Sequence, residues 1–306
     1  MDSTTRKKSL LPQMTKKQRW DTVFVYCLLA PSIITALIFY IYVNLSSFGL
    51  AFTRNEEFAG WYNFQLLLDQ IKTPGSTLSI SVENTLIFFI RNLVIFAWGI
   101  LIAYFFYKKV PGTDLIRILW TLPGLITGMV YVLMYETLIE PGGVVEELIR
   151  VFNKDFVMPQ LLGRSDTARW AILFYTIWMG WGHNMLYLGG TFARIPLEVL
   201  ESARLDGVGP WRELFEIILP MVMPTIGTLF LLEVLALPSA GGPILLFTEG
   251  NYNTSTISYW LFTLILDTGP NQYSIAAAAG MVITAFMLPI ALLVRWLTNR
   301  LDEVTY

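Results

Sequence analysis

Six long apolar runs constrain this chain more than any other feature. A helix needs about 20 mostly apolar residues to cross the hydrocarbon core of a bilayer. The runs cover Thr22 to Val43, Thr85 to Tyr107, Leu115 to Ile139, Ala168 to Phe192, Met221 to Phe247 and Ser274 to Thr298. They are continuous rather than alternating, which disfavours the strands of a transmembrane barrel. Charged residues make up only 14% of the 306 residues, about half the share of a soluble domain. The sequence therefore predicts an all-α integral membrane protein with six transmembrane helices.

The distribution of cations predicts the orientation of these helices. Six lysines and arginines precede the first run, and cytoplasmic segments are rich in such residues. The first run is too long for a signal peptide and no small-residue cleavage site follows it, so we interpret it as a retained anchor. We expect a cytoplasmic N-terminal segment at residues 1–21, a membrane domain at 22–298 and a cytoplasmic tail at 299–306. Both termini are then cytoplasmic.

The polar stretch between the fourth and fifth runs is predicted to form a helical hairpin. Pro196 suits the first turn of a helix, where its missing N–H is harmless. Gly207 stands where a left-handed C-cap is expected. Pro210 opens a second helix, and Pro220 then leads into the fifth run. The hairpin occupies residues 194–220 on the cytoplasmic side. An interfacial helix anchored by Trp211 is the simpler alternative, but such an anchor needs no tight Asp-Gly turn.

The stretch "IPLEVLESARLDGVGPWRELFEIILP" resembles the cytoplasmic EAA loop of permease subunits from binding-protein-dependent ABC importers, of the carbohydrate-uptake type. That pattern has Glu-Ala-Ala, a glycine after three residues, and Ile-x-Leu-Pro after nine more. The matching residues are Glu201, Ala203, Gly207, Ile217, Leu219 and Pro220. Ser202 departs from the pattern by replacing the first alanine. The segments "ENTLIFF", "ILWTLPGLITGMVY" and "TEGNYNTSTISYWLF" are also similar to that family and occur in the expected order.

The resemblance implies that the hairpin is a coupling helix that docks on a separate cytoplasmic ATPase. The residues assigned to this coupling are Glu198, Glu201, Ala203, Asp206, Gly207 and Trp211. The implied partners are a homologous second permease subunit, ATP-binding subunits, an extracellular substrate-binding protein, a carbohydrate substrate and the lipid bilayer. The implied location is the bacterial plasma membrane, with a multi-pass chain.

Nucleotide chemistry is not expected in this chain, because no G-x-x-x-x-G-K-[ST] phosphate loop occurs in it. ATP and Mg²⁺ are expected to be used by the partner ATPase, so the chain is predicted to be a transport subunit rather than an enzyme, with no bound cofactor. One cysteine and one histidine do not make a Cys/His metal site. The net charge of −2 and the absence of a basic stripe beyond the N-terminus give no indication of nucleic-acid binding.

Polar and aromatic residues inside the apolar runs are candidates for the substrate pathway, because transporters bind substrate near the bilayer midplane. The candidates are Trp178, Trp181, His183, Asn184 and Glu233. Helix packing is the alternative role for these residues. Arg91 and Glu136 lie at similar depths in the second and third runs, which predicts a structural ion pair or a shared polar cavity. The alternative is that the Arg91 side chain snorkels toward the membrane surface.

We also expect a break within the fifth run and short helices in two of the connections. "LPSAGGPILL" is expected to break the fifth helix near its outer end, and Ser255 to Leu266 is expected to form a short helix over the outer mouth. Small helices are expected around Trp61 to Asp69.

Two alternative functions remain. A secondary transporter would usually show inverted repeats, and a membrane scaffold would leave the hairpin unexplained. ATP dependence and copurification of an ATPase distinguish these alternatives from the importer.

Overall fold

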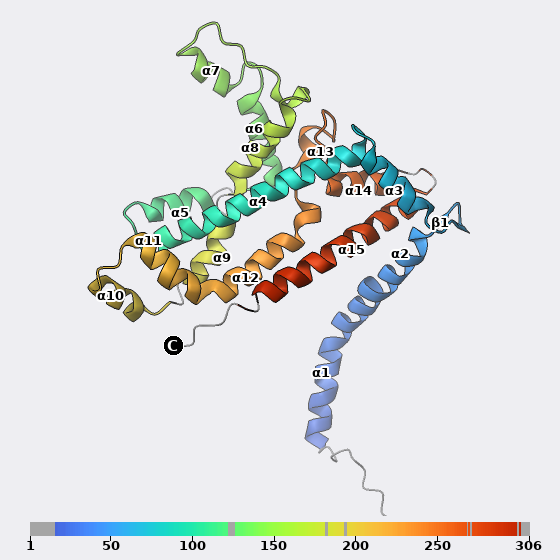
Figure 1. The fold of residues 1–306 in the computed structure, drawn as a ribbon, viewed down its shortest axis with the longest axis horizontal. Helices are drawn as coiled ribbons and strands as arrows, with labels where there is room; N and C mark the ends of the chain where they lie inside the picture. Colours follow the sequence, from blue (N-terminus) through green and yellow to red (C-terminus); the bar gives the residue numbers. More distant parts are fainter. Residues whose placement is uncertain are drawn as a thin grey trace, which may run out of the picture.

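The computed structural model describes residues 16–121, 126–180, 183–192, 195–267, 269, 271–298 and 300. In this part of the chain, four helices are long and apolar enough to cross a membrane: Trp20–Ala51, Thr77–Tyr107, Pro210–Leu235 and Gln272–Thr298. Three of them, α4 (Thr77–Tyr107), α12 (Leu219–Leu235) and α15 (Gln272–Thr298), run side by side as the centre of the molecule (Figure 1). The helical fold class is confirmed.

The N-terminal helix diverges from this centre. It consists of α1 (Lys16–Thr35), the π-helical segment η1 (Ala36–Tyr42) and α2 (Val43–Ala51). Only α2 packs against the central helices, along α15, whereas α1 extends away from the rest of the chain (Figure 1). No residue of the most apolar window of this helix is buried. The predicted first span therefore forms, but most of its surface faces away from this chain.

A short β-hairpin follows, which the prediction of an all-α protein did not include. Strand β1 (Thr53–Arg54) pairs antiparallel with β2 (Glu57–Phe58). Asn55 and Glu56, between the strands, have φ values of 50° and 65°, as a two-residue hairpin of the I′ type requires. The turn lacks the glycine that usually signals it. Helix α3 (Tyr62–Lys72) then fills the region where small helices were predicted.

The second and sixth predicted spans are confirmed as α4 and α15. Helix α4 begins earlier than predicted because Ser76 caps it, accepting a hydrogen bond from the Ser79 amide at 3.1 Å. The end of α15 meets α12 at Gly227, where a Cβ atom would lie 3.0 Å from the Thr298 side chain. The part of the helix from Pro210 to Gly227 therefore extends past the end of α15 at Thr298.

The third predicted span is divided, which corrects the prediction of one continuous helix there; of the fourth span, the structure describes the helical parts on either side of residues 181–182. The third consists of α5 (Thr113–Thr121) and α6 (Gly128–Ile139), which point in different directions in Figure 1. The fourth consists of α8 (Ala168–Gly180) and α9 (His183–Phe192). Between α6 and α8 lie α7 (Val144–Arg150) and the 3₁₀ turn η3 (Leu161–Gly163). Hydropathy detects the apolar length of a segment but not a change of direction within it.

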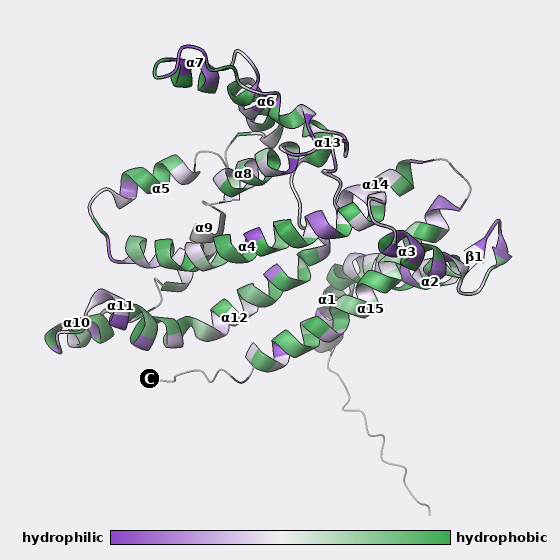
Figure 2. Ribbon diagram, turned by 45° about the horizontal axis from the view of Figure 1, so that its top comes forward, coloured by the Kyte–Doolittle hydropathy of each residue, from purple (hydrophilic) through white to green (hydrophobic). Residues whose placement is uncertain are grey.

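The predicted break of the fifth span is confirmed. Helix α12 ends at Leu235 and is followed by the 3₁₀ turn η5 (Leu237–Ser239) and by α13 (Ile244–Phe247). The predicted short helix is α14 (Ile257–Leu266), capped by Thr256. Figure 2 shows apolar residues along α4, α12 and α15, and hydrophilic residues around α7 and the β1 hairpin. This pattern fits helices in lipid and connections in water.

The segment before α14 is fixed to α4 by buried polar contacts. The side-chain amide of Asn84 donates to the carbonyl oxygens of Asn253 and Ser255 at 2.8 and 2.7 Å. The Ser81 hydroxyl donates to Ser255 Oγ at 2.8 Å, and the Ile257 amide donates to Thr85 Oγ1 at 2.9 Å. The segments "ENTLIFF" and "TEGNYNTSTISYWLF" thus meet in space. We call the end of the bundle with α3, α13 and α14 the far end. The opposite end, with residues 195–218, is called the hairpin end.

Candidate functional site

The first limb of the hairpin is α10 (Leu197–Leu205), and its end is built as predicted. Gly207 has a φ of 72°, a left-handed conformation that glycine adopts without steric cost. The Val208 amide donates to the Ala203 carbonyl at 3.0 Å, the bond that closes a Schellman C-cap. Local residue chemistry is therefore sufficient to set this turn.

The second limb begins at Pro210, as predicted, but does not stop at Pro220. Helix α11 (Pro210–Arg212) continues through the π-helical segment η4 (Glu213–Ile218) into α12. A π-helical adjustment is one of the ways in which a helix tolerates a proline that cannot donate its backbone hydrogen bond. A single helix therefore extends from the turn through Pro220 into the fifth span.

Most residues assigned to coupling lie on the exposed surface of the hairpin. Glu198, Glu201, Asp206, Gly207 and Trp211 are exposed, and Trp211 retains 60% of its accessible surface. Ala203 is buried instead. It packs on the inner face of α10 together with Leu200, so its small size permits close packing rather than contact with a partner.

Leu205, at the end of α10, was not predicted as a functional residue. It is 89% exposed. In the sequence it lies on the exposed side of the helix with Glu198 and Glu201, opposite the buried Leu200. A leucine on the polar face of an amphipathic helix was the available signal.

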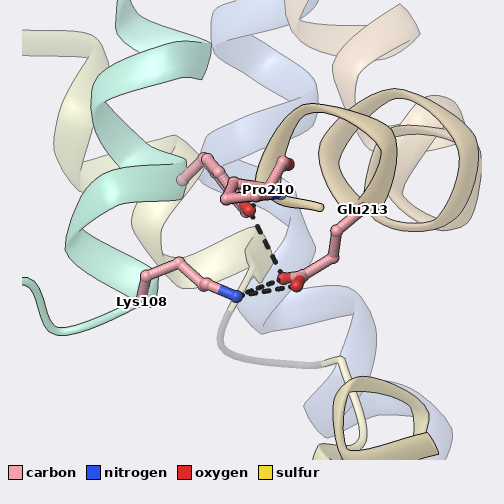
Figure 3. A network of polar contacts seen from close by, with 4 residues as sticks. Lys108, Pro210 and Glu213 are labelled. Carbon is pink, nitrogen blue, oxygen red and sulfur yellow. Dashed lines mark hydrogen bonds and ion pairs between the residues drawn. The ribbon is translucent and has the colours of Figure 1, made fainter. Parts of the chain in front are cut away.

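A buried ion pair joins the hairpin to the end of α4. Lys108 Nζ lies 2.7 Å from Glu213 Oε2 and 2.8 Å from Oε1, next to Pro210 (Figure 3). The Glu213 side chain is 2% exposed and the Lys108 side chain 19% exposed. The hydroxyl of Tyr104, one turn before Lys108, donates to the Pro210 carbonyl at 2.9 Å. The sequence analysis did not identify this pair, because its members are far apart in the chain.

A cavity of about 470 Å³ lies among α4, α8, α12 and the loop after η5. Its charged lining residues are Arg91 from α4 and Glu233 from α12, and Asn92, Tyr175 and Thr176 add polar groups. Arg91 donates to the Gly241 carbonyl at 3.2 Å and interacts electrostatically with Glu233. One cation and one anion therefore face a space large enough for a small polar solute.

The remaining substrate candidates are placed only in part. Trp178 does not line the cavity; it packs against Tyr131, Tyr135 and Tyr175, with ring centroids 6.2, 6.3 and 6.5 Å away. It therefore supports Tyr175, which does line the cavity. Trp181 lies outside the described residues. His183 and Asn184 form the start of α9, whose backbone is described there without these side chains.

The ion pair predicted between Arg91 and Glu136 is absent from the ion pairs of the described residues. Arg91 turns toward Gly241 and Glu233, and Glu136 is half-buried on α6 and does not line the Arg91 cavity. Similar depth along two helices, on which the prediction rested, does not specify which helix faces which. In the described part of the chain, no group of three or more His, Cys, Asp or Glu side chains is arranged to hold a metal ion.

Comparison with known proteins gives a consistent family match. The family described as "binding-protein-dependent transport system inner membrane component" matches residues 82–303. The multiple sugar-binding transport system permease protein MsmF of Streptococcus mutans serotype c is 25% identical over 272 residues, covering 86% of this chain and 90% of MsmF. The sn-glycerol-3-phosphate transport system permease protein UgpA of Shigella dysenteriae serotype 1 is 28% identical over 233 residues, covering 71% and 72%.

Solved structures share the fold. A chain of a bacterial ABC transporter involved in the import of the acidic polysaccharide alginate aligns with a TM-score of 0.78 and 25% identity, covering 95% of this chain and 99% of that one. A second structure, of a bacterial alginate ABC transporter in complex with an alginate pentasaccharide-bound periplasmic protein, aligns with a TM-score of 0.78 and 24% identity, covering 94% and 98%.

Proposed function

Because this chain belongs to the family of binding-protein-dependent transport system inner membrane components, we propose that it moves a sugar or an oligosaccharide through a path beside the Arg91–Glu233 cavity. As a member of this family it is the multi-pass permease subunit of an ABC importer in the inner membrane, and it is not the catalytic subunit. The sugar is the proposed part. It is supported by relatives whose systems are named for multiple sugars and alginate.

The proposed complex contains two permease subunits, this chain and a homologous partner, and two cytoplasmic ATPase subunits that bind ATP and Mg²⁺. An extracellular binding protein delivers the substrate. Six crossings place both termini in the cytoplasm, with the segment α5–α6 as the third crossing and the segment α8–α9 as the fourth. The N-terminal segment 1–21, the membrane domain 22–298 and the tail 299–306 are then the three parts of the chain.

The observation that carries the proposal is the continuous helix Pro210–Leu235. Its first residues belong to the exposed hairpin, and its last turns bring Glu233 to the cavity. At 1.5 Å per residue this helix is about 39 Å long. Force applied to the hairpin by a docked ATPase would therefore reach the cavity through one stiff element.

The docking surface we propose is the exposed side of α10 and its turn. It offers the acidic Glu198, Glu201 and Asp206, the aromatic Trp211 and the exposed Leu205. Tryptophan is among the residues enriched in binding hot spots, and Trp211 is the aromatic member of this surface. The acidic groups would pair with cations of the ATPase, and Leu205 would enter an apolar groove on it.

A matched pair of exposed residues tests this proposal. Leu205→Glu changes the tip of the hairpin, and Phe152→Glu changes a residue that is 93% exposed after α7. Neither change disturbs the core of this chain. We expect Leu205→Glu to abolish copurification of the ATPase subunits after coexpression, and Phe152→Glu to leave it intact. Retention of the ATPase by Leu205→Glu at wild-type levels would refute the docking surface, and ATP-independent uptake would favour a secondary transporter.

The substrate class is tested through the binding protein of the same system. Maltooligosaccharides, alginate oligosaccharides and sn-glycerol 3-phosphate are titrated into the purified protein by calorimetry. Binding of a saccharide supports the proposed cargo. Binding of sn-glycerol 3-phosphate alone would replace the sugar with a polar phosphate ester and would leave the importer mechanism unchanged.

A further inference from the structure

The last turn of α4 contacts both ends of the hairpin. The Tyr107 hydroxyl donates to the Ile195 carbonyl, just before α10, at 3.4 Å. The Tyr104 hydroxyl donates to the Pro210 carbonyl, at the start of the second limb, at 2.9 Å. Helix α4 is far from the hairpin in the sequence. These contacts and the Lys108–Glu213 pair are the polar contacts that link the two elements.

The Lys108–Glu213 pair is the most specific part of this link. Lys108 is the C-cap of α4, a position where a cation interacts favourably with the helix dipole. Its Nζ contacts both carboxylate oxygens of Glu213, as Figure 3 shows. Glu213 Oε1 also lies 3.4 Å from the Tyr104 hydroxyl. A buried carboxylate without such partners is costly, so Glu213 holds η4 in one orientation relative to α4.

Apolar packing also joins these elements but is less directional. Tyr104 belongs to a cluster with Leu200, Leu214 and Ile218, and contacts of this kind are not directional. The two short N–O contacts of the ion pair define an angle as well as a distance. Sliding of η4 along α4 would therefore break the ion pair before it exposed the apolar cluster.

We propose that Lys108 and Glu213 are positioning residues that make α4 follow the movement of the hairpin. This inference rests on the proposed coupling to an ATPase. Helix α12 follows the hairpin because the second limb of the hairpin and α12 form one helix. Helix α4 follows the hairpin through the ion pair. Arg91 and Asn92 line the cavity from α4, and Glu233 lines it from α12. The pair thus makes both walls of the cavity move together. Along α4, the cavity residue Asn92 is about 24 Å from Lys108.

The test uses the full complex of this chain, its partner permease and the ATPase subunits in lipid nanodiscs. Ile90→Cys on α4 and Leu232→Cys on α12, two exposed positions, carry spin labels in a Cys27→Ser background. The distance between the labels is measured without nucleotide and after trapping with ATP, Mg²⁺ and vanadate. In the otherwise unchanged protein we expect the same distance in both states, because the two helices move together.

We expect Lys108→Met and Glu213→Gln to change this result. In the trapped state the distance should shift by more than half a helical turn, about 3 Å, or split into two populations. Lys108→Arg should behave as wild type. The control is Arg212→Gln, which removes an exposed ion pair to Glu216 with a 2.6 Å contact on the same helix and should leave the distance unchanged.

Two outcomes would overturn the inference. The first is a wild-type distance in both states of an assembled Lys108→Met complex. The second applies if the single variants do not assemble: the charge-exchange variant Lys108→Glu/Glu213→Lys must then restore assembly and wild-type distances, and failure to do so refutes the role of the pair. Copurification of the ATPase is scored separately, so loss of docking is distinguished from loss of transmission.

Discussion

Asn84 Nδ2 lies 2.7 Å from the carbonyl oxygen of Ser255, across 171 residues of sequence. Both residues are buried, and the same amide nitrogen donates to the Asn253 carbonyl at 2.8 Å. A single side chain thus donates to two carbonyl groups of the segment before α14, of which the Ser255 carbonyl is in a buried contact. It fixes the far end of α4 against the loop that covers the bundle.

Asn84→Ala is expected to destabilise this end of the molecule. It removes two hydrogen bonds and leaves two carbonyl groups without their donor, which costs about 2 kcal/mol. Thermal unfolding of the purified protein in detergent measures the effect. Asn44→Ala is the control, because Asn44 is exposed and bonds only to the Tyr40 carbonyl of its own helix. Equal unfolding temperatures for the two variants would contradict the role of Asn84.

Gly207 is expected to be required for its backbone conformation rather than for its small size. Its φ is 72°, and nothing in the described chain lies within 4 Å of an added Cβ atom. Gly207→Asn should retain ATPase copurification, because asparagine tolerates this conformation, whereas Gly207→Val should lose most of it through strain of roughly 1–2 kcal/mol. Gly209→Ser, at a position with φ of −71°, is the control. Equal behaviour of Asn and Val at position 207 would contradict this explanation.

Glu233→Gln is expected to alter substrate handling if the cavity lies on the pathway. The change keeps the shape of the side chain but removes its charge opposite Arg91. Loss of a charged hydrogen bond to the substrate would raise the half-saturating concentration of loaded binding protein in an ATPase assay by about tenfold. Glu136→Gln is the matched control, since Glu136 is outside the cavity. If both variants titrate like the wild type, Glu233 does not contact the substrate.

Gly242→Ala is expected to distort the wall of the cavity. A Cβ atom there would lie 2.8 Å from Ile172 Cγ2 and 2.9 Å from Thr176 Cγ2, and such overpacking costs about 1–3 kcal/mol. Gly280→Ala in α15 is the control: nothing in the described chain lies within 4 Å of its Cβ, and alanine stabilises a helix by about 0.5–1 kcal/mol relative to glycine. Unfolding temperatures should therefore shift in opposite directions, and a shift in the same direction would refute the packing argument.

The turn before α7 is expected to loosen in acid. The Gly142 amide donates to Glu146 Oε2 at 2.6 Å and lowers the pKa of Glu146, with a smaller contribution from Arg150. Because the folded pKa is depressed, the stabilisation is complete above the unfolded value of about 4.3 and is lost as the pH falls through the folded pKa. Hydrogen exchange of residues 142–158, corrected for intrinsic rates, should be faster at pH 3 than at pH 7. In Glu146→Gln this difference should disappear, and its persistence would point to another group.

The sequence was sufficient for features that depend on near neighbours. The Gly207 cap, the helix start at Pro210 and the break after Leu235 follow from the chemistry of a few adjacent residues. The long apolar runs specified the four helices that reach membrane length in the described chain. The residues assigned to coupling were taken from one local stretch, and most of them are exposed; their role in docking stays a prediction.

Only the tertiary structure decided which of these elements meet. Arg91 and Glu136 were matched by depth, but position along a helix does not fix which side of the bundle a residue faces, and Arg91 lies beside Glu233 instead. The division of the third span escaped hydropathy for a similar reason, since apolar length carries no direction. Lys108 and Glu213 are polar residues in separate connections, 105 positions apart. Their contact depends on how α4 packs on the hairpin, because long-range packing, and not local propensity, brings such residues together.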